Sequence, residues 1–365
     1  MIYHVFNGRQ IHLAPSISKG FITVYAETAA SHIVIIGGNT DNKMKYIEMF
    51  RSLGFERYSF ISTLLQFAFF IRKTKNSAVL LHGCKHEWNI IALAFGGKNV
   101  NWVCWGSGSS MGNNWKSKLV TPIKRYLYQK FNTIVTLMED DKSSMIKDFH
   151  VNPEKIETIS YASSGPEYPF DHLLDQLLGE RRLPEKKPLL LLGNSPHEMH
   201  NYIDMLHRLA HLKGKIRVQC MNNYSLKRGK LYNQLIATGQ ELFGDDFRSN
   251  EEFYSNLSDY YHYMNSCDVY ICSSISQTGL GAIGTCLRLG KKIYANGKNL
   301  NWMRSHYGVL IFDTNIITND ISFEDITNPL NQFQKLQNSE IMKKQRIRDV
   351  EMWIIYLAKI DKANS

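Results

Sequence analysis

The sequence lacks the features that mark a secreted, disulfide-linked or membrane-spanning protein. Its six cysteines, at positions 84, 104, 220, 267, 272 and 286, show no Cys-x-x-Cys spacing, which argues for reduced thiols and against a zinc site. The longest apolar run, residues 58–71, is too short to cross a bilayer. The first residues, MIYHVFNGRQ, have no basic segment before a hydrophobic core, so we expect no signal peptide and a cytoplasmic location.

Acidic residues are scarce in one part of the chain. Residues 57–138 contain eleven Lys and Arg residues but one carboxylate, Glu87, within a chain of formal net charge +10. A basic field of this kind attracts nucleic acid, anionic lipid headgroups or a phosphorylated substrate. Apolar and aromatic residues are interleaved with the charges in FISTLLQFAFFIRKTK and KLVTPIKRYLYQKF, which favours a membrane surface over nucleic acid. A solvated face that keeps the protein soluble is the alternative.

Short β-type runs alternate with longer helical patterns, which predicts an α/β protein with two doubly wound domains. The expected strands are Tyr3–Phe6, His32–Ile36, Ala78–His82, Val100–Trp105, Thr133–Leu137, Ile156–Ser160, Leu189–Leu192, Ile216–Met221, Val269–Ser273, Lys292–Ala295 and Val309–Phe312. We expect an N-terminal domain over 1–165, a linker over 166–187, a C-terminal domain over 188–330 and a helical tail over 331–365. Open parallel sheets bind ligands beyond the carboxyl ends of their strands, so the sites are expected there.

The segment DVYICSSISQTGLGAIGTCLRLGKKIYAN, residues 268–296, contains the Gly-x-Gly-x-x-Gly spacing of dinucleotide-binding proteins. That fingerprint normally opens its domain and is followed by an acidic residue that holds a ribose. Here it falls at the fourth strand of the second domain, and residues 285–312 contain no Asp or Glu. The pattern therefore disfavours a nicotinamide-dependent dehydrogenase.

A simpler anion site remains at this turn. Gly279 and Gly281 allow a ligand to approach the backbone at the start of a helix, where unpaired N–H groups and the helix dipole favour a phosphate. Gln277 and Thr278 add side-chain donors. A second turn, Gly193-Asn194-Ser195, follows the first strand of the same domain, so the two turns together predict a nucleotide-diphosphate site. The alternative is that the glycines serve only close packing of helix and strand.

The stretches LLHGCKHEWNIIALAFGG, LLLGNSPHEMHNYI, SDYYHYMNSCDVYI and SQTGLGAIGTCLRLGKKIYANGKNLNW resemble one known family. They are similar to the TDP-Fuc4NAc:lipid II Fuc4NAc transferases of glycosyltransferase family 56, the WecF type. The similarity extends from His4-Val5 to about Phe312, and it rests on the order and spacing of the motifs.

The resemblance implies a GT-B fold, with two Rossmann-like domains facing a central cleft and a tail that packs back on the N-terminal domain. It implies a transferase that moves a Fuc4NAc-like deoxyamino sugar from a TDP- or UDP-linked donor to a polyprenyl-diphosphate-linked glycan. This reaction belongs to synthesis of enterobacterial common antigen or O-antigen, at the cytoplasmic face of the bacterial inner membrane. The implied donor-binding residues are Gly193, Asn194, Ser195, Gln277, Thr278, Gly279, Leu280, Gly281, Asn296, Asn299 and Trp302.

The resemblance implies no metal and no cofactor, and the chain has no Asp-x-Asp motif. The candidate general bases are His82, Glu87 and His12; a structural role for His82 and a charge-balancing role for Glu87 are the alternatives. The neighbourhoods HVFNGRQIHLAP and CWGSGSSMGNNW lack the carboxylates that family members carry, which leaves another nucleotide sugar and another acceptor open. A basic nucleic-acid-binding protein is the alternative outside the enzymes, and it would need a binding motif that we do not find.

Overall fold

The computed structural model describes residues 1–7, 32–37, 58–83, 86–105, 115–160, 171–180, 187–193, 201–222, 229–251, 254 and 257–362. By its internal contacts the chain divides into two units. Unit 1 contains Met1–Pro166 and Arg346–Ser365, and unit 2 contains Glu167–Gln345.

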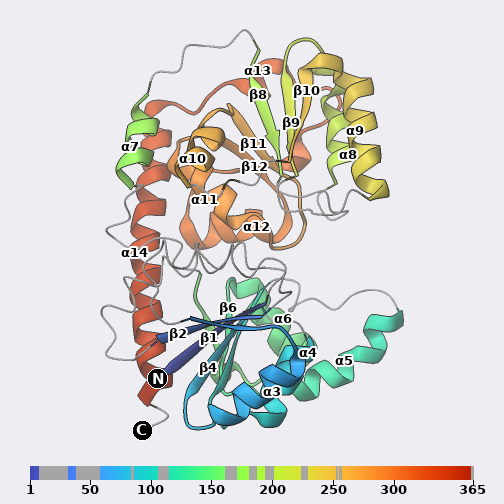
Figure 1. Ribbon diagram of the computed structural model, residues 1–365. Coiled ribbons are helices and arrows are strands. Elements are labelled where there is room, and N and C mark those ends of the chain that lie inside the picture. Colours follow the sequence, from blue (N-terminus) through green and yellow to red (C-terminus); the bar gives the residue numbers. More distant parts are fainter. Residues whose placement is uncertain are drawn as a thin grey trace. The chain divides into compact units, whose positions relative to one another are not determined.

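Unit 1 is built on a parallel sheet of seven strands in the order β3-β2-β1-β4-β5-β6-β7 (Figure 1). The strands are β1 (Ile2–Asn7), β2 (His32–Gly37), β3 (Tyr58–Ile61), β4 (Ala78–His82), β5 (Val100–Cys104), β6 (Ile134–Thr136) and β7 (Ile156–Thr158). Because the chain runs outward from β1 in one direction and from β4 in the other, the sheet is doubly wound. Each strand pairs in parallel with its neighbours, and His4 of β1 lies opposite Val34 on one side and Leu80 on the other.

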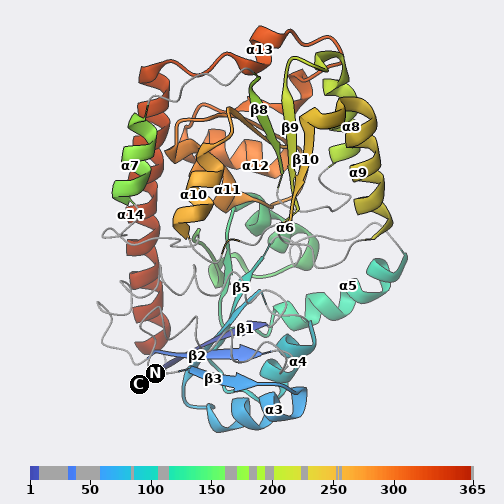
Figure 2. The same ribbon diagram turned by 45° about the horizontal axis from the view of Figure 1, so that its top comes forward.

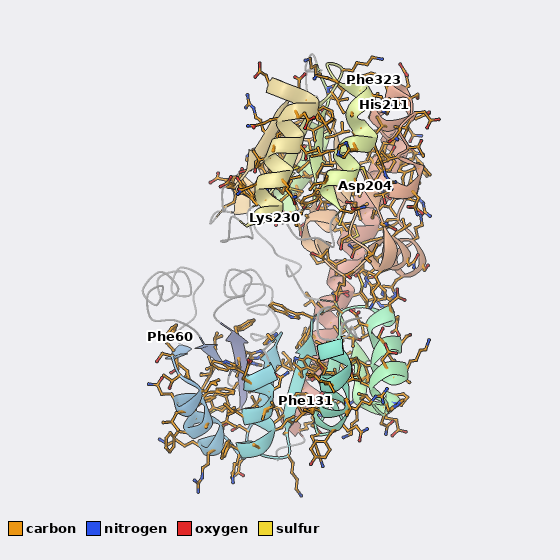
Figure 3. All side chains as sticks on the ribbon, turned by 90° about the vertical axis from the view of Figure 1, so that its right-hand side faces the viewer. Phe60, Phe131, Asp204, His211, Lys230 and Phe323 are labelled. Atoms are coloured by element: carbon orange, nitrogen blue, oxygen red, sulfur yellow. The ribbon has the colours of Figure 1, made fainter. Side chains whose placement is uncertain are left out.

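Both faces of this sheet are buried, as the continuous apolar strands predict. One face packs against α3 (Leu64–Lys73), α4 (His86–Phe95), α5 (Trp115–Tyr128) and α6 (Glu139–Phe149). Figure 2 shows α3 and α4 along this face, and Figure 3 shows Phe131 in the interior of the unit. The other face packs against the last part of α14 (Gln332–Lys362), where Trp353 is fully buried and its indole N–H donates to the carbonyl O of Ser160 at 2.8 Å.

Unit 2 contains a second parallel sheet, of six strands in the order β10-β9-β8-β11-β12-β13. The strands are β8 (Leu189–Leu192), β9 (Arg217–Met221), β10 (Phe247–Asn250), β11 (Val269–Cys272), β12 (Lys292–Ala295) and β13 (Phe312–Asp313). The helices are α7 (Asp171–Gly179), α8 (Tyr202–Leu209), α9 (Lys230–Phe243), α10 (Leu257–Asn265), α11 (Leu280–Arg288), α12 (Gly297–Trp302), α13 (Phe323–Thr327) and the first part of α14. This sheet is also doubly wound, with β8 and β11 as its central pair.

Helix α7, which lies in the segment expected to be a linker, is packed within unit 2. It buries Leu174 and Leu177, and the guanidinium of Arg288 bridges its two carboxylates. The Nη2 atom of Arg288 lies 3.1 Å from Asp171 and 2.9 Å from Asp175. Because Arg288 is itself buried, these pairs hold α7 against α11.

Each strand expected from the sequence overlaps a strand of the structure, and two further strands, β3 and β10, were not expected. The apolar run at 58–71 is β3 followed by α3, whose first turn is capped by the Thr63 hydroxyl. Among the helices that the structure describes, none is long and apolar enough to span a bilayer.

Candidate functional site

The two glycine turns of unit 2 leave neighbouring strands. From β8 the chain winds to β9 and β10, then crosses to β11 on the other side, so the switch point of the sheet lies between β8 and β11. Gly193 follows β8, and its N–H donates to the carbonyl O of Ile271 in β11 at 2.8 Å. The turns that begin at residues 193 and 273 therefore start side by side at one edge of the sheet. Asn194 and Ser195 lie outside the described residues.

Gly193 has a packing role in the described structure. Its φ of +52° lies in the left-handed region, and a Cβ atom there would lie 1.8 Å from the hydroxyl oxygen of Tyr202. The absence of a side chain allows the Tyr202 ring to cover the end of β8. Because its N–H is already bonded to Ile271, Gly193 affects the candidate site through its backbone conformation and its lack of a side chain.

The turn at Gly279 opens helix α11. Gly279 precedes the helix with φ of +70°, and its carbonyl accepts the N–H of Ile283 at 2.9 Å, which closes the first helical turn. The N–H groups of Leu280, Gly281 and Ala282 precede that bond, so no carbonyl of the helix is placed to accept them. Gly281 is exposed, and a Cβ atom on it would meet nothing within 4 Å. An open space therefore adjoins the positive end of a helix, which is the geometry of an anion site.

The loop between β11 and α11 is held in one conformation by its own polar groups. The Ser274 hydroxyl accepts the Ser276 N–H at 3.3 Å and donates to the Ser276 carbonyl at 3.1 Å. Asn299, which is fully buried in α12, donates from Nδ2 to the carbonyl O of Thr278 at 2.9 Å. These bonds fix the backbone that leads into the helix before any ligand arrives.

Gln277 carries an unused acceptor in this loop. Its side chain is half-buried, and its Oε1 atom is buried without a hydrogen-bond partner among the described residues. Buried polar atoms are normally paired, so an unpaired acceptor in the loop before α11 is a candidate partner for a donor group of a ligand. A sugar hydroxyl or an amide N–H has the required chemistry.

Residues that follow β12 pack against the loop between β11 and α11. The Asn296 side chain accepts the Gly297 N–H at 2.7 Å, and a Cβ atom on Gly297 would lie 2.4 Å from the carbonyl O of Ile275. The two loops thus touch backbone to backbone. Trp302 is buried and its ring stacks on His306 with centroids 3.8 Å apart, which places it in the core of the unit. Contact of Asn296, Asn299 or Trp302 with a sugar stays a prediction.

The candidate bases belong to unit 1. His82 ends β4, is fully buried, and stacks on Phe6 with ring centroids 4.3 Å apart. Burial lowers the pKa of His82 to about 3, so the ring is neutral at physiological pH. Glu87 is exposed in the first turn of α4, where a carboxylate complements the helix dipole. His12 lies outside the described residues.

Sequence reasoning missed His4 and His32, which join His82 in a chain of three hydrogen-bonded histidine rings. The Nε2 atom of His82 lies 3.1 Å from Nδ1 of His4, and Nε2 of His4 lies 3.1 Å from Nδ1 of His32. The three rings come from β4, β1 and β2. The strand register places them diagonally on one face of the sheet, and that register is not readable from the sequence.

Neither the comparison with protein-family models nor the comparison with curated proteins gave a match. Three solved structures illustrate what the fold is similar to. A glycosyltransferase from Rickettsia africae has a TM-score of 0.67 and 14% identity, covering 100% of this chain and 98% of its own. The Anabaena protein HepE in complex with UDP and glucose has a TM-score of 0.69 and 11% identity, covering 98% and 99%. UDP-GlcNAc 2-epimerase from Neisseria meningitidis bound to UDP-GlcNAc has a TM-score of 0.58 and 13% identity, covering 98% and 99%.

These similarities, with the two doubly wound parallel sheets, define the fold. The chain has the two-domain α/β architecture of the GT-B glycosyltransferases. Within the described residues, no group of three or more His, Cys, Asp or Glu side chains is placed to hold a metal ion.

Proposed function

We propose that the protein is a glycosyltransferase that binds a nucleotide-diphosphate sugar at the carboxyl edge of the sheet in unit 2. The observation that carries the proposal is the open, exposed start of α11 at the switch point, beside the turn that follows β8. The N–H groups of Leu280, Gly281 and Ala282 belong to the first turn of this helix, where the helix dipole also favours an anion. The similarity to HepE in complex with UDP and glucose supports the same ligand class.

In this proposal the start of α11 stabilises the departing diphosphate. When the bond between the anomeric carbon and the phosphate oxygen breaks, negative charge grows on that oxygen. Prealigned N–H donors stabilise such charge, and a single donor of this kind contributes about 3 kcal/mol to the transition state. The Gln277 Oε1 atom accepts a hydrogen bond from the sugar, which orients it for transfer.

For the donor sugar and the acceptor, the proposal relies on the resemblance of the sequence to glycosyltransferase family 56. We propose a TDP- or UDP-linked deoxyamino sugar of the Fuc4NAc type as donor and a polyprenyl-diphosphate-linked glycan as acceptor, in synthesis of a bacterial surface polysaccharide. His82, Glu87 and His12 are the candidate bases for the acceptor hydroxyl. Another nucleotide sugar or acceptor would use the same site.

A lipid-linked acceptor implies an enzyme that works at a membrane surface, and unit 1 has a face suited to that role. Helix α5 exposes Leu119, Ile123 and Tyr126, which lie on one helical stripe and are 67%, 56% and 63% exposed. In two views the amino-terminal part of α5 projects away from the sheet (Figure 1, Figure 2). Residues 88–138 contain six Lys and Arg residues and no carboxylate, so the charge around the stripe complements anionic lipid. We propose peripheral binding at the cytoplasmic face of the inner membrane.

A thermal-shift panel of TDP, UDP, GDP and NAD tests the ligand class. We expect TDP or UDP to stabilise the protein, by about 2.7 kcal/mol at a concentration 100 times the dissociation constant, and NAD to have no effect. Stabilisation by NAD alone, or by none of the four, would contradict the proposal.

An epimerase acting on a nucleotide sugar is the second candidate, because the epimerase from Neisseria meningitidis shares the fold. The two reactions differ in their products. A glycosyltransferase releases the free nucleoside diphosphate when an acceptor is present, whereas an epimerase returns an isomeric nucleotide sugar. Chromatography of the nucleotides after incubation separates the two outcomes.

A further inference from the structure

The large apolar side chains that unit 1 exposes lie mainly on the helices that cover one face of its sheet. Helices α3, α4 and α5 pack against that face through Phe67, Trp88 and Tyr128. Apart from Met1 and two residues of α14, every exposed large apolar side chain that the structure describes in unit 1 lies on these three helices. Single exposed apolar residues are common on proteins, whereas their concentration on one layer indicates an interaction surface.

Helix α3 carries an apolar stripe of its own, separate from the stripe of α5. Leu65 and Phe69 are 68% and 60% exposed, and their spacing of four positions places them on one side of the helix. Arg72 continues this side toward the end of the helix. The opposite side of the helix, with Phe67 and Ile71, is fully buried against the sheet. The α3 stripe, Leu65 and Phe69, therefore faces away from the sheet.

The α5 stripe faces away from the same side of the sheet. Tyr128 of α5 is buried and its ring lies against Trp102 of β5, with centroids 4.8 Å apart. At 100° per residue, the stripe of Leu119, Ile123 and Tyr126 lies on the side of α5 opposite Tyr128. Helix α4, which lies beside α3, exposes a further apolar residue between the two stripes (Figure 2). One extended partner surface can thus contact both stripes.

The charges around the α3 stripe have one sign. Residues 58–83 and 88–105 contain no carboxylate and four basic residues, all of them exposed: Arg72, Lys73, Lys75 and Lys98. A Cβ atom on Gly97 would lie 1.9 Å from the carbonyl O of Lys75, so the turns that carry Lys75 and Lys98 adjoin at the ends of α3 and α4. Glu87, which lies between the two ranges in the sequence, is in the first turn of α4, at the other end of that helix.

Exposed apolar side chains flanked only by cations match the chemistry of an anionic membrane surface. The acyl chains accept the apolar side chains, and the lipid phosphates attract the Lys and Arg residues. We propose that unit 1 docks on an anionic membrane through two helices, with the α3 stripe as a second contact in addition to the α5 stripe. The inference rests on the proposed peripheral binding at a membrane, and it implies that two separated contacts fix the tilt of unit 1 on the bilayer.

Co-sedimentation of the full-length protein with vesicles of phosphatidylglycerol and phosphatidylcholine tests the second contact. Leu65→Gln combined with Phe69→Gln should lower the partition coefficient at least about tenfold, since both side chains would leave the acyl region. Ile355→Gln is the matched control and should leave the coefficient unchanged. Ile355 is 68% exposed, as Leu65 is, but it belongs to α14, which packs on the other face of the sheet.

Two further sets of variants separate the contributions. Free energies of separate contacts add, so joining the α3 pair with Leu119→Gln and Ile123→Gln should multiply the two losses. Lys73→Gln and Lys75→Gln should each lower binding to the anionic vesicles about fivefold and leave binding to pure phosphatidylcholine unchanged.

The outcomes distinguish this inference from the proposals on which it rests. Wild-type binding by the α3 double variant would overturn the second contact and leave the α5 stripe in place. Absence of vesicle binding by the wild type would overturn both contacts, whereas sugar transfer is measured separately as release of TDP or UDP. A wild-type dimer in ultracentrifugation without vesicles, lost in the α3 double variant, would show that a second copy of the chain covers the α3 stripe instead.

Discussion

The side-chain amide of Asn299 forms hydrogen bonds with both backbone polar groups of Thr278. Its Nδ2 atom donates to the Thr278 carbonyl at 2.9 Å, and its Oδ1 atom accepts the Thr278 N–H at 3.4 Å. Nδ2 also lies 3.5 Å from the Cys272 sulfur at the end of β11. Asn299 therefore ties α12 to the loop that presents the start of α11, although it is fully buried.

Replacing Asn299 with Leu should loosen this loop. The substitution removes both hydrogen bonds between the Asn299 side chain and the Thr278 backbone, and a net loss of about 0.5–1.5 kcal/mol is typical for each such bond. We expect a lower free energy of unfolding and weaker binding of UDP and TDP, measured by urea unfolding and calorimetric titration. The matched control is Asn301→Leu in the same helix, where the side chain is exposed. Equal effects of the two substitutions would contradict the role of Asn299.

Breaking the ion pairs between α7 and Arg288 should destabilise unit 2. Arg288→Met removes the guanidinium from Asp171, Asp175 and the Ser339 hydroxyl, which lies 2.6 Å away. Asp175 is exposed and keeps Lys343 at 3.2 Å, so we expect the loss of charge-assisted hydrogen bonds to cost about 1.5–3 kcal/mol. Lys344→Met is the control, since Lys344 pairs with Glu340 at 3.6 Å on the exposed side of α14 and such a pair contributes about 0–1 kcal/mol. Chemical unfolding of the two variants measures the difference.

The histidine chain predicts a loss of stability in acid. In the unfolded chain a histidine takes up a proton near its ordinary pKa of about 6.5, whereas the folded protein holds His82 neutral down to about pH 3 and His32 to about pH 4. Since the unfolded state binds more protons in this interval, the free energy of unfolding falls as pH drops from about 6.5 toward 4. Urea unfolding at a series of pH values measures the slope, which should be shallower in His32→Gln. A stability that stays level over this range would contradict the buried, neutral chain.

The exposed stripe of α5 should bind anionic vesicles. We expect co-sedimentation with vesicles containing phosphatidylglycerol, weakening at high salt, since each basic residue near the surface contributes about 1 kcal/mol. Leu119→Gln combined with Ile123→Gln should lower the partition coefficient at least about tenfold, because each buried apolar side chain contributes about 1.5–3 kcal/mol. Phe333→Gln is the control, because Phe333 is 74% exposed at the start of α14 in unit 2. An equal loss in the control, or no binding by the wild type, would remove the membrane face from the proposal.

The sequence predicted the positions of the strands best where the strands are buried on both faces. Leu189–Leu192 and Lys292–Ala295 form with the expected bounds because four apolar or long side chains in a row suit a strand covered on both sides. Strand β10, with the sequence FRSN, lies at the edge of its sheet and carries one apolar residue, so periodicity gave no signal for it. Strand β3 was not predicted because its apolar residues are followed closely by those of α3, so the two elements form one apolar run in the sequence.

The candidate site was predictable in part for a similar reason. The left-handed turn at Gly279 and the helix that follows depend on nearby residues, so the sequence pattern indicates both. The contact of Asn299 with Thr278, across 21 positions, depends on tertiary packing. The histidine chain depends on the register of three strands, which sequence pattern alone does not determine.

The most direct test of the central claim is binding of UDP and TDP to two variants at one position. A side chain at Gly281 points into open space at the start of α11, so neither Gly281→Ala nor Gly281→Asp should disturb the fold. If a diphosphate binds there, Gly281→Asp places a carboxylate against it and should weaken binding at least about tenfold, whereas Gly281→Ala should stay within about twofold of the wild type. Equal affinity of the wild type and both variants in calorimetric titration would show that the diphosphate does not bind at the start of α11.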